Sequence, residues 1–217
     1  MIKLYGHPFA AFVWKPLIAL RERAVPFEFL MVDPDHPENG AALARLAPTG
    51  QFPVLVDGAR TVVESSVVIE YLDRFGDAPP LVPADPLAAI EVRQMDGIFD
   101  DYVAAPMQRI VADALRDPAV RDPHGVAEAK AALSRAYDWL ERWLAGRTFA
   151  AAGMFSMADC AAAPALFYAD WVHEIPAGCA ALRDYRARLL AHPSVAHVVD
   201  GARPYRPYFP LGAPDRD

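Results

Sequence analysis

Two short stretches of the chain combine residue types that could hold a small polar ligand. The first is TGQFPVL over residues 49–55. A proline at the start of an apolar strand, after a glycine-containing loop, is a favourable place for a cis peptide bond. A cis bond before Pro53 would turn the Phe52 main chain outward, where it could pair with an extended peptide like an added strand. An ordinary proline between a loop and a strand explains the same pattern equally well.

The second stretch is Glu64-Ser65-Ser66, between a predicted strand and a predicted helix. Ser65 or Ser66 could cap that helix, and the free N–H groups of a helix N-terminus favour an anion. The carboxylate of Glu64 could take an ammonium group beside it. Together these features would hold a carboxylate and an ammonium on one α-carbon. An ordinary helix cap is the competing interpretation.

Several other chemistries lack the residues they need. The chain has neither GxGxxG nor GxxxxGK, so no phosphate-binding loop is predicted. There is no CxxC pair, and Cys160 and Cys179 both lie in the second half, where we expect Cys160 to be a small buried residue. No pair among the six histidines combines zinc-ligand spacing with a nearby cysteine pair, so no metal site is predicted. No Ser, Thr or Cys precedes Thr49.

The first part of the chain alternates strands and helices. We expect strands at 2–5, 27–32, 53–56 and 61–63, and helices at 11–23, at 41–46 and from Ser65 onward. Asp57-Gly58 is a hairpin turn signal between the last two strands. The order βαβ followed by αββα indicates a sheet with some parallel pairing. Four prolines within residues 76–86 mark a linker.

The second part is predicted to be all helix. One apolar stripe runs through Val92, Met95, Phe99 and Tyr102. Another comprises Ala129, Leu133, Ala136, Leu140 and Leu144. Ser156 and Asp159 resemble a capping box at the start of a third helix, and a fourth is expected to end near 192–193. The proline- and aromatic-rich tail from residue 203 is expected to lie irregularly against the surface.

Composition narrows the function classes. Lys plus Arg is 21 and Asp plus Glu is 28, so the net charge of 21 − 28 = −7 argues against nucleic-acid binding. Two cysteines are too few for a disulfide scaffold and fit a reducing cytoplasm. The most apolar run, 160–169, is too short to cross a bilayer, and the N-terminus does not resemble a signal peptide.

Four segments in order resemble the cytosolic glutathione S-transferase family, most of all its bacterial and phi/theta-like members. They are LYGHPFAAFVWKPLIALRE, TGQFPVLVDG, VVESSVVIEYLDR and FSMADCAAAPALFYA. The resemblance runs from residue 2 to about residue 199 and implies the transferase fold. That fold has an α/β thioredoxin-like, glutathione-binding domain at 1–76, a linker at 77–86, and an all-helical domain with an irregular tail at 87–217.

The resemblance also implies a site and an activity. Glutathione would be the co-substrate, with a small apolar electrophile beside it near Tyr102, Met107 and Trp171. The residues implied to bind glutathione are Gln51 (glycyl carboxylate), Phe52 and Pro53 (cysteinyl main chain), and Glu64 and Ser65 (γ-glutamyl end). The family implies a cytoplasmic homodimer with a role in detoxification. Asp100 is the best match for an acidic residue that reaches the γ-glutamyl amine of the partner subunit. The Ser156/Asp159 box matches a folding element.

One departure leaves the catalytic residue unknown. Serine-type members place a serine at the start of the first helix, where this chain has Ala10 and Ala11, and the usual arginine of that helix is replaced by Trp14 followed by Lys15. Main-chain N–H groups, or Tyr5, would then have to stabilise the thiolate. The resemblance therefore supports glutathione transfer to an electrophile. The alternatives are a non-catalytic glutathione- or ligand-binding protein, and a structural module that does not use glutathione.

Overall fold

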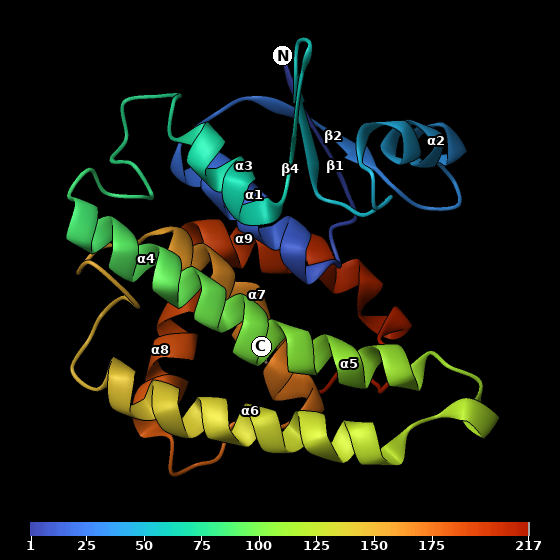
Figure 1. Ribbon diagram of the computed structural model, residues 1–217, viewed down its shortest axis with the longest axis vertical. Helices are drawn as coiled ribbons and strands as arrows, with labels where there is room; N and C mark the ends of the chain where they lie inside the picture. Colours follow the sequence, from blue (N-terminus) through green and yellow to red (C-terminus); the bar gives the residue numbers. More distant parts are fainter. Residues whose placement is uncertain (217) are drawn as a thin grey trace.

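The computed structural model describes residues 1–216, and a four-stranded mixed sheet forms its N-terminal layer (Figure 1). The strands are β1 (Ile2–Gly6), β2 (Phe27–Met31), β3 (Val54–Asp57) and β4 (Arg60–Val63), in the order β2-β1-β3-β4. Strand β1 is parallel to β2 and antiparallel to β3, and β3 forms a hairpin with β4. Parallel pairing within a βαβ unit is therefore confirmed.

Helices cover both faces of this sheet. Helices α1 (Ala11–Glu22) and α3 (Ser65–Leu72) pack together on one face, and α2 (Pro37–Leu46) covers the other. Successive strand residues point to opposite faces, and β1 shows the consequence. Leu4 joins the core with α1, whereas Tyr5 packs against Leu43 of α2.

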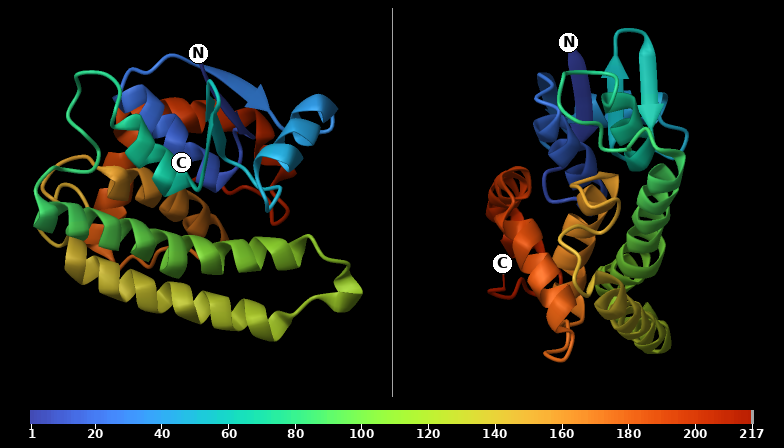
Figure 2. Two further views of the ribbon diagram at one scale, coloured as in Figure 1. Left: turned by 45° about the horizontal axis from the view of Figure 1, so that its top comes forward. Right: turned by 90° about the vertical axis from the view of Figure 1, so that its left-hand side faces the viewer.

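The rest of the chain is helical and lies below the sheet domain (Figure 2). Its helices are α4 (Pro86–Phe99), α5 (Ala105–Ala114), α6 (Pro123–Leu144), α7 (Met157–Val172), α8 (Ala180–Ala191) and α9 (Pro193–Ala202). A π-helical turn (Asp100–Ala104) joins α4 to α5, and short 3-10 helices lie at Pro118–Val120 and Arg203–Tyr208. The glutathione S-transferase fold is thus present.

Helix α7 is the centre of the helical layer. Fifteen of its residues, Met157 to Trp171, are buried, so it is apolar on all sides as expected of a core helix. It packs against both α1 and α4. The predicted capping box is confirmed: Asp159 accepts hydrogen bonds from the Ser156 N–H and hydroxyl, and also from the Tyr185 hydroxyl at 2.7 Å. The box fixes the start of the helix on which both layers rest.

The π-helical turn overturns one predicted apolar stripe. Val92, Met95 and Phe99 are buried as expected, but Tyr102 is 62% exposed and Val103 is buried instead. A π-turn accommodates an extra residue, so the side-chain register advances by one position after Phe99. Periodicity of 3.6 residues assumes a continuous α-helix and therefore places Tyr102 on the wrong face.

Other differences concern helix ends and the tail. Helix α2 begins at Pro37 rather than at residue 41, because a proline in the first turn needs no N–H donor. Helices α5 and α9 were not predicted from the sequence. The predicted end of the fourth helix near residues 192–193 is confirmed, since α8 ends at Ala191, and the unpredicted α9 starts directly after it at Pro193. The linker assignment of 77–86 stays a prediction.

The buried Arg23 and the partly exposed Asp73 hold the segment after α3 in place. Arg23 is 3% exposed and donates hydrogen bonds to the main-chain carbonyls of Phe75, Ala78 and Pro79. Asp73 accepts from the Leu81 and Val82 N–H groups. In residues 1–216, no helix is both long and apolar enough to span a membrane.

Candidate active site

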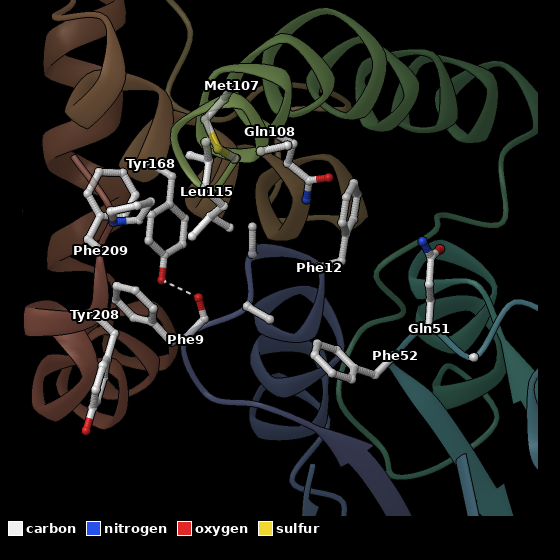
Figure 3. A pocket seen from close by; sticks show the side chains of 16 residues that line it. Phe9, Phe12, Gln51, Phe52, Met107, Gln108, Leu115, Tyr168, Tyr208 and Phe209 are labelled. Carbon is white, nitrogen blue, oxygen red and sulfur yellow. Dashed lines mark hydrogen bonds between the residues drawn. The ribbon is translucent and has the colours of Figure 1, made fainter. Parts of the chain in front are cut away.

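A cavity of about 580 Å³ lies where the N-terminal end of α1 faces the helical layer (Figure 3). The residues that line it are Phe9, Ala10, Ala11, Phe12, Gly50, Gln51, Phe52, Met107, Gln108, Val111, Ala112, Leu115, Tyr168, Tyr208, Phe209 and Pro210. The list holds no Lys, Arg, Asp or Glu. Within the described part of the chain, this cavity therefore suits an uncharged, largely apolar group on its helical side.

The start of α1 brings main-chain donors to this cavity. Ala10 caps the helix without a side-chain hydrogen bond, and its own N–H is taken by the His7 carbonyl. Among residues 1–216 we find no acceptor for the N–H groups of Ala11 and Phe12. Unpaired N–H groups and the positive end of the helix dipole favour an anion here. The start of this helix carries no hydroxyl of its own, because residues 10 and 11 are alanines, and the nearby Tyr168 hydroxyl donates to the Phe9 carbonyl.

Two side chains near β1, Tyr5 and His7, carry a donor that a thiolate could use, but neither lines the cavity. Tyr5 packs on the far side of the sheet in the cluster of Leu43 and Val54, so it is excluded as the hydroxyl donor. His7 accepts from the Phe9 N–H at its Nδ1 and packs edge-on against Tyr205. Burial lowers the pKa of His7, which keeps its ring neutral near pH 7.

The TGQFPVL segment borders the other end of the cavity. The Phe52–Pro53 peptide bond is cis, as predicted, and Gln51 and Phe52 line the cavity. Among the described residues we find no hydrogen bond to the main chain of Phe52. Its N–H and carbonyl are therefore free for an extended peptide, which is the role that the resemblance implies for them.

The β3–β4 hairpin brings the second motif beside the first. Val54 pairs with Val63, so Pro53 and Glu64 are neighbours across the hairpin. Glu64 caps α3 with a φ of 69°, a left-handed conformation that is uncommon outside glycine. Neither serine makes a side-chain cap, so the predicted capping role is wrong. Ser65 is buried at the first position of α3, and Ser66 points elsewhere.

Ser66 belongs to a polar cluster between the two layers, which also includes Lys15, Asp96 and Asp100. Lys15 and Asp96 are buried, and Ser66 and Asp100 are partly buried. Lys15 is 1% exposed, and its Nζ donates to Ser66 Oγ at 2.9 Å and to Asp100 Oδ2 at 2.5 Å. The same Nζ forms an ion pair with Asp96 Oδ1 at 2.9 Å, and Ser66 Oγ donates to Asp96 Oδ2 at 2.6 Å. One ammonium thus faces two carboxylates.

The pKa of Asp100 is raised in this cluster, which has two carboxylates and one ammonium. Burial raises the pKa of Asp100 to about 6; the Lys15 ammonium lowers it, and the Asp96 carboxylate raises it again. Asp100 was expected to be available to a partner subunit, but one of its oxygens is held by Lys15 of its own chain. The neighbouring Asp101 is the exposed acid of this turn.

We expect Asp100→Asn to raise the free energy of unfolding at pH 8 by about 1–3 kcal/mol. The ordinary pKa of 3.8 rises to about 6 in the folded chain, so the folded chain binds this proton more tightly. The stability from that proton is complete below pH 3.8 and is lost as the pH rises through 6. Urea unfolding at pH 4.5 and 8 measures the effect, and the gain over wild type should grow with pH. Asp101→Asn is the control, and an equal gain at both pH values would contradict the expectation.

The helical side of the cavity is more aromatic than the sequence suggested. Of the three residues expected there, Met107 lines it, whereas exposed Tyr102 and buried Trp171 do not. In Figure 3 the rings of Phe9, Tyr168, Tyr208 and Phe209 gather at one end, with Gln51 and Phe52 at the other.

The aromatic end is held in place by its own contacts. The Tyr168 hydroxyl donates to the Phe9 carbonyl at 2.8 Å, and the Phe9 and Tyr168 rings meet edge to face. Phe209 stacks against Tyr168 with ring centroids 6.3 Å apart. The tail was expected to lie irregularly on the surface, yet residues 208–210 form a wall of the cavity. The density of aromatic residues in YRPYFP was the available signal.

The Cys160 thiol and the potential metal ligands do not form a second site. Cys160 is fully buried, and burial raises the pKa of its thiol well above the usual range. It is therefore a core residue, as predicted, and not a nucleophile. In residues 1–216 no group of three or more His, Cys, Asp or Glu side chains could hold a metal ion.

Comparison with known proteins shows which family has this architecture. The N-terminal domain model of glutathione S-transferase matches residues 4–80, and the C-terminal domain model matches residues 123–188. The GST-like protein YibF of Escherichia coli K12 is 28% identical over 179 residues, covering 82% of this chain and 87% of that protein. A stringent starvation protein A homolog of Haemophilus ducreyi is 29% identical, covering 86% of this chain and 84% of that protein.

Solved structures agree with the family models. The glutathione S-transferase of Methylobacterium radiotolerans, in complex with glutathione sulfonate, is 25% identical with a TM-score of 0.79, covering 91% of this chain and 94% of that chain. The glutathione S-transferase of Methylobacillus flagellatus, solved with glutathione bound, is 22% identical with a TM-score of 0.82, covering 91% and 98% of the two chains. Two domain models in the right order and a shared fold lead to one conclusion: the chain belongs to the glutathione S-transferase family.

Proposed function

We propose that this protein binds glutathione beside the Phe52–Pro53 bond and transfers its thiolate to a small apolar electrophile. One observation carries the proposal: a single cavity joins Gln51 and Phe52, at the expected glutathione site, to the aromatic wall of the helical layer. Both reactants would thus lie side by side, and proximity is itself a large part of catalysis. The glutathione sulfonate bound to the Methylobacterium radiotolerans relative supports the choice of ligand.

In the proposed complex each part of glutathione has a counterpart in the chain. The main chain of Phe52 pairs with the cysteinyl residue, and Gln51 takes the glycyl carboxylate. Glu64 and Ser65 hold the γ-glutamyl end, with the carboxylate at the start of α3 and the ammonium on Glu64. The hairpin register that places Glu64 beside Pro53 supports this arrangement.

The proposed thiolate lies at the start of α1, where the N–H groups of Ala11 and Phe12 stabilise it. Lowering a thiol pKa from about 8.5 to about 6.5 needs roughly 2.7 kcal/mol. A hydrogen bond to a charged acceptor gives roughly 1.5–3 kcal/mol, and a helix terminus roughly 0.3–1 kcal/mol. Two main-chain donors at a helix terminus could therefore supply most of this activation, and a serine hydroxyl would add one further donor.

The lack of a serine at the start of α1 favours a second candidate function. With alanine at positions 10 and 11, the protein could bind glutathione or an apolar ligand without fast chemistry. The two candidates differ in the state of the bound thiol.

Ultraviolet titration of the thiolate in the glutathione complex distinguishes the two. A thiol pKa clearly below that of free glutathione, with turnover of aromatic or alkyl electrophiles, supports the transferase. Binding by calorimetry with an unshifted thiol pKa and no turnover supports the binding protein. Absence of glutathione binding at millimolar concentration would contradict the transferase and any glutathione-binding role, and would leave only the binding of an apolar ligand or a structural module.

We also propose that the protein is a cytoplasmic homodimer with a role in detoxification. Exposed apolar residues on α3 and α4 support the dimer. Val67 of α3 and Leu87 and Ile90 of α4 are 53%, 77% and 59% exposed. An ion pair between Arg93 and Glu70 connects the same two helices. A self-complementary face of this kind would be buried by a second copy.

We expect Ile90→Glu to shift the protein from two chains to one, because it places a charge on the proposed dimer face. Light scattering coupled to gel filtration measures the mass. Val120→Glu changes an equally exposed apolar residue on another surface and should leave the mass unaltered. A wild-type mass of one chain, or an unchanged mass in Ile90→Glu, would contradict the proposed interface.

A further inference from the structure

The polar cluster of Lys15, Ser66, Asp96 and Asp100 has no part in the proposed reaction. Its hydroxyl group belongs to Ser66, the residue directly after Ser65. Ser66 lies at the second position of α3, in the turn whose N-terminus would face the γ-glutamyl group. Its Oγ accepts from Lys15 Nζ at 2.9 Å and donates to Asp96 Oδ2 at 2.6 Å. The hydroxyl is therefore held from both sides by charged groups.

The four members of the cluster come from four elements of the fold. Lys15 lies on α1, Ser66 on α3, Asp96 on α4, and Asp100 opens the π-helical turn toward α5. Charge-assisted hydrogen bonds are short and directional. The first turn of α3 is thereby fixed relative to α1, whose start would hold the thiolate, and relative to the helix that leads to Met107.

Local geometry shows why α3 needs such a support. Its N-cap is Glu64 in a left-handed conformation, without a side-chain cap from Glu64 or from either serine. A helix start without a side-chain cap is less stable than a capped one. The bond to Ser66 anchors this turn through its side chain and leaves its first N–H groups free for a ligand.

We propose that Ser66, held by Lys15 and Asp96, is a positioning residue for the γ-glutamyl end of glutathione. It touches no part of the ligand; it orients the first turn of α3, on which Ser65 and Glu64 make the contacts. The inference rests on the proposed glutathione site and adds to it the residue that keeps one half of that site in register with the other.

A pair of ligands separates this role from general stabilisation. S-hexylglutathione and S-hexyl-cysteinylglycine share the apolar tail and the cysteinylglycine part, and only the first has the γ-glutamyl group. We expect Ser66→Ala to weaken S-hexylglutathione binding about five- to tenfold in calorimetry. Binding of S-hexyl-cysteinylglycine should change less than about twofold, because the rest of the site is untouched. Ser66→Thr keeps the hydroxyl and should restore the wild-type difference between the ligands.

Ser134→Ala is the matched control, since it removes a serine that bonds to His173 on another part of the helical layer. Equal weakening of both ligands by Ser66→Ala, or weakening of neither, would overturn the positioning role. The proposed glutathione site is tested separately, by the wild-type protein. If that site were wrong, wild type would bind the two ligands equally, because the γ-glutamyl group would make no contact.

Discussion

Ala10→Ser is expected to lower the pKa of the bound glutathione thiol by about one to two pH units relative to wild type. Ala10 is the N-cap of α1 and lines the cavity beside the unpaired N–H groups of Ala11 and Phe12. A hydroxyl at this position adds one donor to the thiolate, worth roughly 1.5–3 kcal/mol. The same substitution supplies a preferred helix cap, so the fold should not suffer.

The catalytic rate should rise as the pKa of the bound thiol falls. At pH 6.5, where little free thiol ionises, kcat is expected to rise about tenfold or more, because each pH unit of pKa lowering is a factor of ten in thiolate. Ultraviolet titration gives the pKa, and initial rates with one electrophile from pH 5.5 to 8.5 give the profile. Ala112→Ser is the control, because it adds a hydroxyl to the same cavity from α5.

Three results would count against this account. An unchanged pKa in Ala10→Ser would mean that the sulfur does not lie at the start of α1. An equal shift in Ala112→Ser would mean that general polarity, and not the position of the donor, sets the thiol pKa. A thiol pKa already near 6.5 in wild type would show that main-chain N–H groups are sufficient and that the alanine is no deficiency.

Lys15→Met is expected to lower the free energy of unfolding by about 3–5 kcal/mol, the largest effect on stability that we expect of a single change. Lys15 is 1% exposed and is the ammonium that faces both Asp96 and Asp100. Methionine fills a similar volume but leaves the buried carboxylate of Asp96 beside the partly buried carboxylate of Asp100. Their repulsion and desolvation are the cost, and the carboxylates would take up a proton to relieve it.

The pH dependence identifies the cause. In Lys15→Met the loss should be large at pH 8 and smaller at pH 5, where a proton neutralises one carboxylate. Adding Asp96→Asn and Asp100→Asn to Lys15→Met removes both negative charges and should recover most of the lost stability. Urea unfolding followed by circular dichroism measures each variant.

Lys3→Met is the matched control, since Lys3 is an exposed lysine whose ion pair with Glu28 spans 3.6 Å. Exposed pairs of this kind contribute roughly 0–1 kcal/mol. A loss in Lys15→Met that is independent of pH, or that persists in the triple variant, would point to packing rather than charge as the role of this side chain.

The sequence alone determined the features that depend on local chemistry. Alternating strand residues, the Asp57-Gly58 turn and the Ser156/Asp159 capping box act over a few residues, so they are legible in the chain. The cis bond before Pro53 was signalled in the same way. The absence of a hydroxyl at the start of α1 also needed no structure, because it follows from Ala10 and Ala11 themselves.

The tertiary structure decided what depends on contacts between distant segments. Lys15 meets residues 51 and 85 positions further along the chain, and only the packing of α1 against α3 and α4 joins them. The π-helical turn removed Tyr102 from the core, a change of register that an apolar pattern cannot reveal. Phe209 reaches the cavity because the tail returns across α7 to stack on Tyr168. Local propensity gave the pieces of the binding site their shape, and long-range packing chose which side chains would line it.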